Sequence, residues 1–436
     1  MNVELRTIKT PAEQALSDAY AAARAQLPGK GALAKLREDA FRRFSATGLP
    51  HRRIEEWKYT DLRALMREAD PLATAPDAAA KARAKDAGKM LAGFDCRRLV
   101  FVDGAFVPEL SDLSPEQGLT VGSMADALAK GDSLVTAHVG KAIETDDVAV
   151  ALNTALMGDG VMIRIAADGQ LKRPVLIDFV SGSQPASIFM RSLIVVEKGA
   201  KALILENHDA SESQVNTALE FVIADEAEVD YVKITRDQKL HIGTLMASVG
   251  ARAKFNTFNF TLGGATVRNQ NFVRFGGEGT VAGIRGATLL NGKEHADTTL
   301  VIDHAAGGCE SREQFRSVLD GESRGIFQGK IIVRPHAQKT DAKMSSNALL
   351  ISDDAEADNK PELEIFADDV QCGHGATAGA LDENLKFYLM ARGIPEKEAE
   401  ALLVQAFAGA VIETIAHEGV RDALLNAAAE WLTARD

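Results

Sequence analysis

Short apolar runs separated by small turn pairs recur through the middle of this chain, and this repeat limits the possible folds more than any other feature. The turns lie about 24 to 28 residues apart, a period that suits the stacked coils of a solenoid, where each coil buries its apolar face against its neighbours. The repeat favours a β-helix core, and a β-sandwich is the alternative, since irregular strand spacing suits both. The turn pairs are Gly199-Ala200, Glu226-Ala227, Gly250-Ala251 and Glu278-Gly279.

The residues around this repeat have the composition of β-strands from about 97 to 370. Runs rich in β-branched and aromatic residues, such as 99–102, 161–165 and 193–196, are punctuated by glycine, and long helical patterns are scarce among them. That scarcity argues against a doubly wound α/β fold, in which a crossover helix follows each strand. We therefore expect a mainly β core over 96–372.

The segment before this core has a helical pattern. Ala, Leu, Lys, Arg and Glu dominate from 11 to about 93, and apolar residues recur there at steps of three to four. Pro50, Pro71 and Pro76 interrupt the pattern, because proline lacks the backbone N–H and clashes with the preceding turn. The sequence therefore predicts an N-terminal helical region over 1–95 that contains several helices.

A helical pattern returns after the core and predicts a C-terminal helical domain over 373–436. Asp382 is a suitable N-cap for the first helix, and Gly393 follows its basic last turn. Pro395 suits the start of a second helix, and a third covers roughly 420–434.

Composition argues against several classes of function. A net charge of -13 disfavours binding to a nucleic-acid backbone. The first residues lack a signal-peptide pattern, and no apolar run approaches the roughly 18 residues of a membrane span. The three cysteines, Cys96, Cys309 and Cys372, are too few for a disulfide framework. We expect a cytoplasmic protein with neither nucleic-acid nor membrane contacts.

Cys372 and His374 form the sharpest candidate site. In a strand, residues two apart project to the same face, so a sulfur and an imidazole face one shared ligand. Thiolate suits iron, copper or sulfur transfer, and imidazole suits iron. The alternative is structural, because cysteine often acts as a small buried hydrophobe. With three cysteines in the chain, a cluster held by thiolates needs ligands from a second subunit.

Two acidic pairs, Asp353-Asp354 and Asp368-Asp369, suggest a different function. Paired carboxylates on a β-helix are typical of enzymes that cleave polysaccharides, which need an acid and a base across a sugar. An aromatic content of 6% is thin for sugar stacking, and no secretion signal is present. A β-helical carbohydrate-active enzyme is therefore the second hypothesis.

At these residues the chain resembles the SufB/SufD family of iron-sulfur cluster assembly proteins. Gly373 and Gly375 flank His374 where SufB proteins typically carry glutamates, and no cysteine stands near 345–347, so the resemblance is to the SufD branch. The motifs that carry it are EEWKYT at 55–60, CESR at 309–312, GIFQGK at 325–330, DDVQCGHGAT at 368–377 and FYLMARGI at 387–394.

The resemblance implies a right-handed parallel β-helix flanked by helical regions, in a scaffold subunit that is not itself an enzyme. It implies a SufB partner joined edge to edge, a SufC ATPase on the C-terminal helices, and pairing of the chain with itself when alone. The absence of a G-x-x-x-x-G-K-[ST] phosphate loop agrees with reliance on a separate ATPase. Cys372 and His374 then lie near a transient iron or cluster at the SufB interface, with no tightly bound cofactor in this chain.

Overall fold

The structure of the chain is a computed structural model that describes residues 9–85, 89–91, 93–182, 184–209 and 212–434. The α-helices are α1 (Pro11–Ala23), α2 (Ala32–Thr47), α3 (Leu62–Leu65), α4 (Ala78–Ala84), α5 (Met124–Lys130), α6 (Ser133–His138), α7 (Val148–Leu156), α8 (Glu383–Met390), α9 (Glu396–Ile412) and α10 (Glu418–Ala434). Short 3-10 turns are η1 (Glu55–Trp57), η2 (Lys89–Leu91) and η3 (Pro108–Leu110).

The strands fill the middle of the chain. They are β1 (Arg97–Val102), β2 (Ala105–Phe106), β3 (Leu119–Ser123), β4 (Val161–Ile165), β5 (Val175–Val180), β6 (Ser187–Val196), β7 (Lys201–Asp209), β8 (Gln214–Ile223), β9 (Glu228–Thr235), β10 (Leu240–Val249), β11 (Lys254–Leu262), β12 (Thr266–Phe275), β13 (Val281–Leu290), β14 (His295–His304), β15 (Glu310–Leu319), β16 (Arg324–Val333), β17 (Asp341–Leu350), β18 (Glu356–Ile365) and β19 (Gln371–Gly379).

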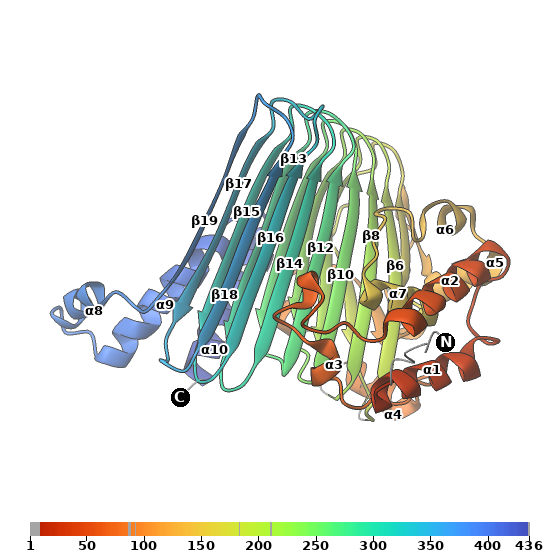
Figure 1. The fold of residues 1–436 in the computed structure, drawn as a ribbon, viewed down its shortest axis with the longest axis horizontal. Coiled ribbons are helices and arrows are strands. Elements are labelled where there is room, and N and C mark those ends of the chain that lie inside the picture. The colour runs from red at the N-terminus through yellow and green to blue at the C-terminus, as the bar shows by residue number, and fades with distance from the viewer. Residues whose placement is uncertain (1–8, 86–88, 92, 183, 210–211, 435–436) are drawn as a thin grey trace, which may run out of the picture.

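From β4 onward, successive strands alternate between two sheets, so each coil gives one strand to each sheet (Figure 1). Neighbouring strands within a sheet run parallel from β4 to β19. The length of a coil varies from 26 residues, as from Glu228 to Lys254, to 32 residues, as from Arg324 to Glu356. A sandwich is built from antiparallel strands, so this topology rules out that alternative. The predicted parallel β-helix core between helical flanks is confirmed.

The turn pairs of the sequence repeat form one corner of the solenoid. Residues there adopt a left-handed backbone, with φ of 68° at Gly199, 63° at Glu226 and 53° at Arg252. Each donates its backbone N–H to a carbonyl of the next coil, as Glu226 does to Ala251 at 2.8 Å. The next residue in each coil is small and buried, and these residues stack as Ala200, Ala227, Ala253, Thr280, Cys309 and Thr340.

Apolar side chains fill the solenoid and also join it to the helices. One core runs through the interior, from Leu99 near the start to Met344 near the end. A second lies between the ten-stranded sheet and α9 and α10, and a third between α1, α7 and the nine-stranded sheet. Helices α1, α2 and α4 to α7 gather at one end of the solenoid, α3 lies nearer its middle, and α8 projects away from the other end (Figure 1).

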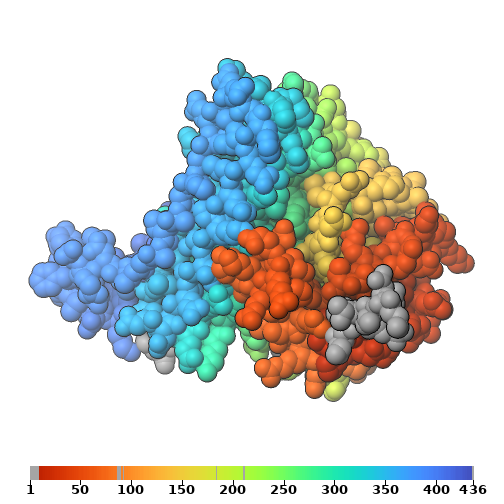
Figure 2. Space-filling view, in the orientation of Figure 1, coloured from red at the N-terminus to blue at the C-terminus, as the bar shows by residue number. Residues whose placement is uncertain are grey.

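The EEWKYT segment fastens the N-terminal region to the outer face of the nine-stranded sheet. Trp57 is buried, stacks 3.8 Å from the guanidinium carbon of Arg268, and donates its indole N–H to Asp147 at 2.8 Å. Thr60 donates to Asp297 at 2.6 Å, and Asp297 also pairs with Arg268. Figure 2 shows this segment, in orange, lying against the solenoid. The motif therefore acts as an anchor.

The helical predictions can be checked element by element. Several helices precede β1, Asp382 caps α8 by accepting from the N–H groups of Asn384 and Leu385, and Gly393 follows α8 with φ of 84°. Two observations bear on the predicted core of 96–372: α5, α6 and α7 lie inside it, and β19 continues beyond it to Gly379. Among the described helices, none is both long and apolar enough to span a membrane.

Candidate functional site

The last coil leaves the C-terminal end of the solenoid open. Within the described chain, β18 pairs along one edge with β16, and β19 along one edge with β17. Every residue of the inner strand β6 is buried, whereas β18 and β19 contain no buried residue. Ile365 and Phe366, where β18 ends, are 41% and 57% exposed. Apolar surface and unpaired strand edges therefore coincide here.

Cys372 and His374 both lie on β19, at this open end. Cys372 stands beside Ala342 of β17, and His374 stands beside Met344. Ala342 and Met344 belong to the interior core, and Cys372 packs against it, so the pair belongs to the inward row of the last coil. Cys372 is half-buried and His374 is exposed. The predicted strand and shared face are thus present, while the metal role remains a prediction.

The surroundings of Cys372 keep its thiol protonated in the absence of a cation. Burial raises the pKa of the Cys372 thiol, and the negative charges of Asp341 and Glu313 raise it further. A hydrogen bond from the backbone of Ala342 acts in the opposite direction. Because the thiolate is the form that binds metals, a cation at this end must displace the thiol proton.

A buried acid lies two coils further in, on the same interior row. Glu313 of β15 stands beside Met344, which stands beside His374, so the three follow one row across the sheet. Glu313 is fully buried, and neither carboxylate oxygen accepts a hydrogen bond of normal geometry from a described residue. Burial raises its pKa to about 7. Sequence reasoning missed Glu313, although it shares the inward parity of Ser311 and Phe315.

The C-terminal helices present a second exposed apolar surface. Val404, Ala408 and Val411 of α9 pack on the ten-stranded sheet. In α8, by contrast, no residue is buried, and Phe387 is 71% exposed. The other exposed apolar side chains of α8 are Leu385, Tyr388 and Met390.

The acidic pairs proposed for sugar cleavage lie at turns. Asp353-Asp354 lies in the turn after β17 and is exposed, and Asp368-Asp369 lies in the bend before β19. Asp369 forms an ion pair with Lys339, and its backbone N–H donates to the side-chain amide oxygen of Gln338 at 2.9 Å. These pairs have the solvated surroundings of turn residues, which does not favour the carbohydrate-active alternative.

The other two cysteines have structural surroundings. Cys309 is one of the small residues stacked at the solenoid corner, and its Sγ lies 3.4 Å from the carbonyl oxygen of Gly277. Cys96 is half-buried against the core that joins the C-terminal helices to the sheet. Burial raises the pKa of both thiols. Neither cysteine shares a strand with Cys372.

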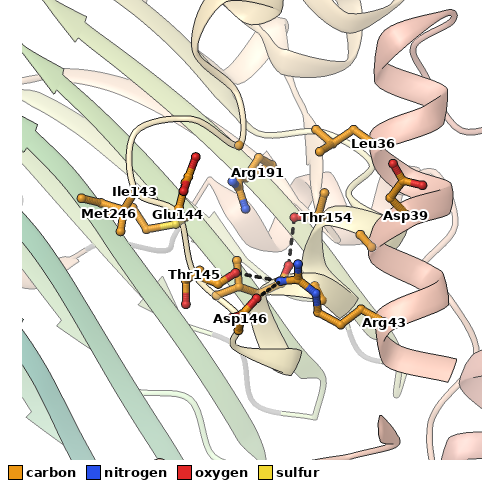
Figure 3. Close-up of a pocket in the computed structure, with 14 residues that line it drawn as sticks. Leu36, Asp39, Arg43, Ile143, Glu144, Thr145, Asp146, Thr154, Arg191 and Met246 are labelled. Atoms are coloured by element: carbon orange, nitrogen blue, oxygen red, sulfur yellow. Dashed lines mark hydrogen bonds and ion pairs between the residues drawn. The ribbon is translucent and has the colours of Figure 1, made fainter. Parts of the chain in front are cut away.

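A cavity of about 500 Å³ lies between α2, the 140–146 loop and the nine-stranded sheet (Figure 3). Arg43 crosses its mouth, donating to the carbonyl oxygen of Thr145 at 2.8 Å and pairing with Asp146 at 3.2 Å. The buried Arg191 at its base pairs with Glu220 at 2.7 Å. The described residues that line this cavity include neither cysteine nor histidine, so the candidate thiol chemistry stays at the open end.

Comparison with known proteins agrees with this arrangement. The description "SUF system FeS cluster assembly, SufBD core domain" matches residues 179–407, and "SufBD protein N-terminal region" matches residues 10–177. The chain therefore belongs to the SufBD family of iron-sulfur cluster assembly proteins. Within the family it is SufD-like: it is 31% identical to the iron-sulfur cluster assembly protein SufD of Escherichia coli, with 87% of this chain and 88% of that protein covered.

Two further relatives extend the comparison. A SufBD family protein of Synechocystis is 30% identical, with 84% of each chain covered. The SufD of Bacillus subtilis is 28% identical over 63% of this chain and 65% of its own length. These relatives are named as members of the cluster assembly family, and the names of both SufD proteins describe assembly. The predicted family is thereby confirmed.

Proposed function

We propose that this chain is a non-catalytic scaffold subunit of an iron-sulfur cluster assembly complex. Its open solenoid end joins a SufB-like solenoid subunit, and its C-terminal helices bind a SufC-like ATPase. Cys372 and His374 contribute to a transient iron or cluster site at the joined ends. The observation that carries the proposal is the position of this pair, on the inward row of the coil that the solenoid leaves open.

The two open strands are unequally suited to pairing with a partner. β18 carries Lys360, Pro361 and Glu362, and charged residues and proline are devices that block edge-to-edge pairing. β19 carries no proline, aspartate, glutamate, lysine or arginine, and space is open around Gly373 and Gly375. A partner strand therefore fits best along β19, where it lies next to the candidate ligands. A second copy of this chain fits the same edge, which supports self-pairing when the partner is absent.

Cys372 and His374 supply only part of the ligand set of an iron ion or cluster. One thiol and one imidazole leave an iron ion or cluster short of ligands, since clusters are held by about four protein ligands. The missing ligands come from the partner subunit in this proposal. A shared site also suits a transient cargo, because separation of the two subunits removes half of its ligands.

The α8 surface suits a protein partner that supplies ATP hydrolysis. The sequence contains no phosphate loop. Phe387 and Tyr388 expose large aromatic surface next to Arg392, whose guanidinium carbon lies 3.5 Å from the centre of the Tyr388 ring. Aromatic and arginine side chains are the residues most often found at the energetic centres of protein interfaces.

Two matched substitutions separate the two interfaces. The chain is co-expressed with tagged SufB-like and SufC-like proteins, and the recovered complexes are weighed by native mass spectrometry. We expect Phe366→Asp to lose the SufB-like subunit alone, and Phe387→Asp to lose the ATPase alone. Leu113→Asp alters an apolar residue of similar exposure away from both surfaces and should lose neither. Retention of both partners by both variants would contradict the proposed surfaces.

A further inference from the structure

A buried group of metal-ligating side chains lies inside the solenoid, away from the open end. His208, Asp237 and His241 each offer one ligand atom, and these three atoms lie within 4.8 Å of one another. All three side chains are at most 1% exposed. His208 lies near the end of β7 in one sheet, and His241 near the start of β10 in the other, so the group links consecutive coils where the chain crosses between sheets.

Two carboxylates hold the two imidazoles in place. Nε2 of His208 lies 2.5 Å from Oε1 of Glu206, and Nδ1 of His241 lies 2.5 Å from Oδ2 of Asp237. The hydroxyl of Tyr231 donates to the other oxygen of Glu206 at 2.8 Å. The group thus offers two imidazole nitrogens and carboxylate oxygens in a buried interior, with no sulfur among its members.

Acidic side chains outnumber the lysine beside them in this group. Glu206 and Asp237 are buried carboxylates, whereas the nearby buried cation is Lys233, whose Nζ lies 2.8 Å from Nε2 of His241. Two buried carboxylates therefore lie beside the two imidazoles, and buried charges are costly unless they are paired. A cation bound between the imidazoles would pair with these carboxylates.

We propose that His208, Asp237 and His241, supported by Glu206, bind one divalent first-row transition-metal ion, Zn²⁺ or Fe²⁺. Two imidazoles with one carboxylate form the ligand set found in zinc and non-haem iron sites. The ion joins two coils and both sheets, and it is independent of the cargo at Cys372 and His374. Binding requires the imidazole protons that face the carboxylates to leave, so that each His–carboxylate pair opens to admit the ion.

Lys233 lies beside the proposed site and opposes binding of the metal ion. An ammonium group beside His241 repels a second cation, so the metal site fills when the Lys233 side chain turns away. Lys233 also contacts Oδ1 of Asn269 at 3.1 Å, which offers it an alternative partner. Lys233→Met, which keeps the length of the side chain and removes its charge, should therefore strengthen metal binding.

The test uses the full chain carrying Cys372→Ser and His374→Ala, so that metal at the open end does not contribute. The protein is refolded with Zn²⁺, or with Fe²⁺ without oxygen, because the buried site exchanges slowly with solvent. Metal content is measured by mass spectrometry after gel filtration, and the ligands by X-ray absorption. We expect one ion per chain, with nitrogen or oxygen neighbours at about 2.0–2.1 Å and no sulfur at about 2.3 Å.

Substitutions then assign the site. His208→Gln and Asp237→Asn should lose the ion, while His336→Gln, which alters an exposed histidine elsewhere, should keep it. Circular dichroism checks that each variant folds. If neither the parent chain nor Lys233→Met retains metal, the proposal is overturned. Metal that survives His208→Gln, or shows a sulfur neighbour, overturns it equally. Each of these results leaves the open-end proposal untouched.

Discussion

Replacing Glu313 with glutamine should make the stability of this protein less sensitive to pH. Burial raises the pKa of Glu313 from 4.5 to about 7, while the unfolded chain keeps the ordinary value. Between these two values the folded protein holds a proton that the unfolded chain releases. Unfolding therefore becomes easier as pH rises through this window, and the loss is complete above pH 7.

The magnitude follows from the difference between the two pKa values. Each pKa unit corresponds to about 1.4 kcal/mol, so the ionised Glu313 lowers the free energy of unfolding by about 3 kcal/mol at pH 8. Glu313→Gln lacks this titration but keeps the size and polarity of the side chain. The variant should gain up to about 3 kcal/mol relative to the parent chain between pH 4.5 and pH 8.

Urea denaturation followed by circular dichroism at several pH values measures this gain. The matched control is Glu310→Gln, which removes an exposed carboxylate from the same strand and should give the same difference at every pH. A constant offset between Glu313→Gln and the parent chain, equal at pH 5 and pH 8, would refute the assigned burial. It would mean that Glu313 finds a partner when it is ionised.

Two other predictions concern stability and reactivity. Trp57→Ala should lower the free energy of unfolding by about 3–5 kcal/mol, because it removes a buried aromatic side chain that stacks on Arg268, whereas the exposed neighbour Lys58→Ala should change little in the same urea titration. Alkylation of Cys372, followed by peptide mass spectrometry against pH, should have its midpoint above the ordinary thiol value of 9.0, because burial disfavours the thiolate; a midpoint at or below that value would show that the thiol is activated.

The solenoid was predictable because its corners leave a local mark in the sequence. A small residue follows each left-handed corner position, as Ala200 follows Gly199 and Ala227 follows Glu226. The third corner is less distinct: the sequence placed the turn at Gly250-Ala251, but the left-handed residue is Arg252. A long polar side chain tolerates this backbone when the N–H is bonded to the next coil, so glycine does not mark every corner.

The sequence marks the ends of α5 inside the core with helix-capping residues, although the composition of this region indicates strands. The serine at 123 caps α5 by accepting the N–H of Asp126, and Gly131 ends it with a left-handed backbone. Both are ordinary helix boundary residues. The prediction of a mainly β core over 96–372 did not use these helix boundary residues, because it rested on the β-branched runs around them.

The candidate sites differ in how far sequence could reach them. Cys372 and His374 are two residues apart on one strand, so strand periodicity alone predicts a shared face. Glu313 was hidden because a shift of one residue exchanges the inner and outer faces of a strand, and a charged residue is normally assigned to the outside. His208 and His241 come together because neighbouring coils stack. The coils differ in length, so no local sequence pattern predicts this contact.

The proposed role of the open end is tested most directly by the cluster content of the assembled complex. The chain is co-expressed with SufB-like and SufC-like partners, and iron and acid-labile sulfide are measured per complex. We predict that His374→Ala lowers both while the subunits still co-purify and the chain stays folded, and that His336→Ala lowers neither. Unchanged iron and sulfide in the His374→Ala complex would contradict the assignment of this end as part of the assembly site.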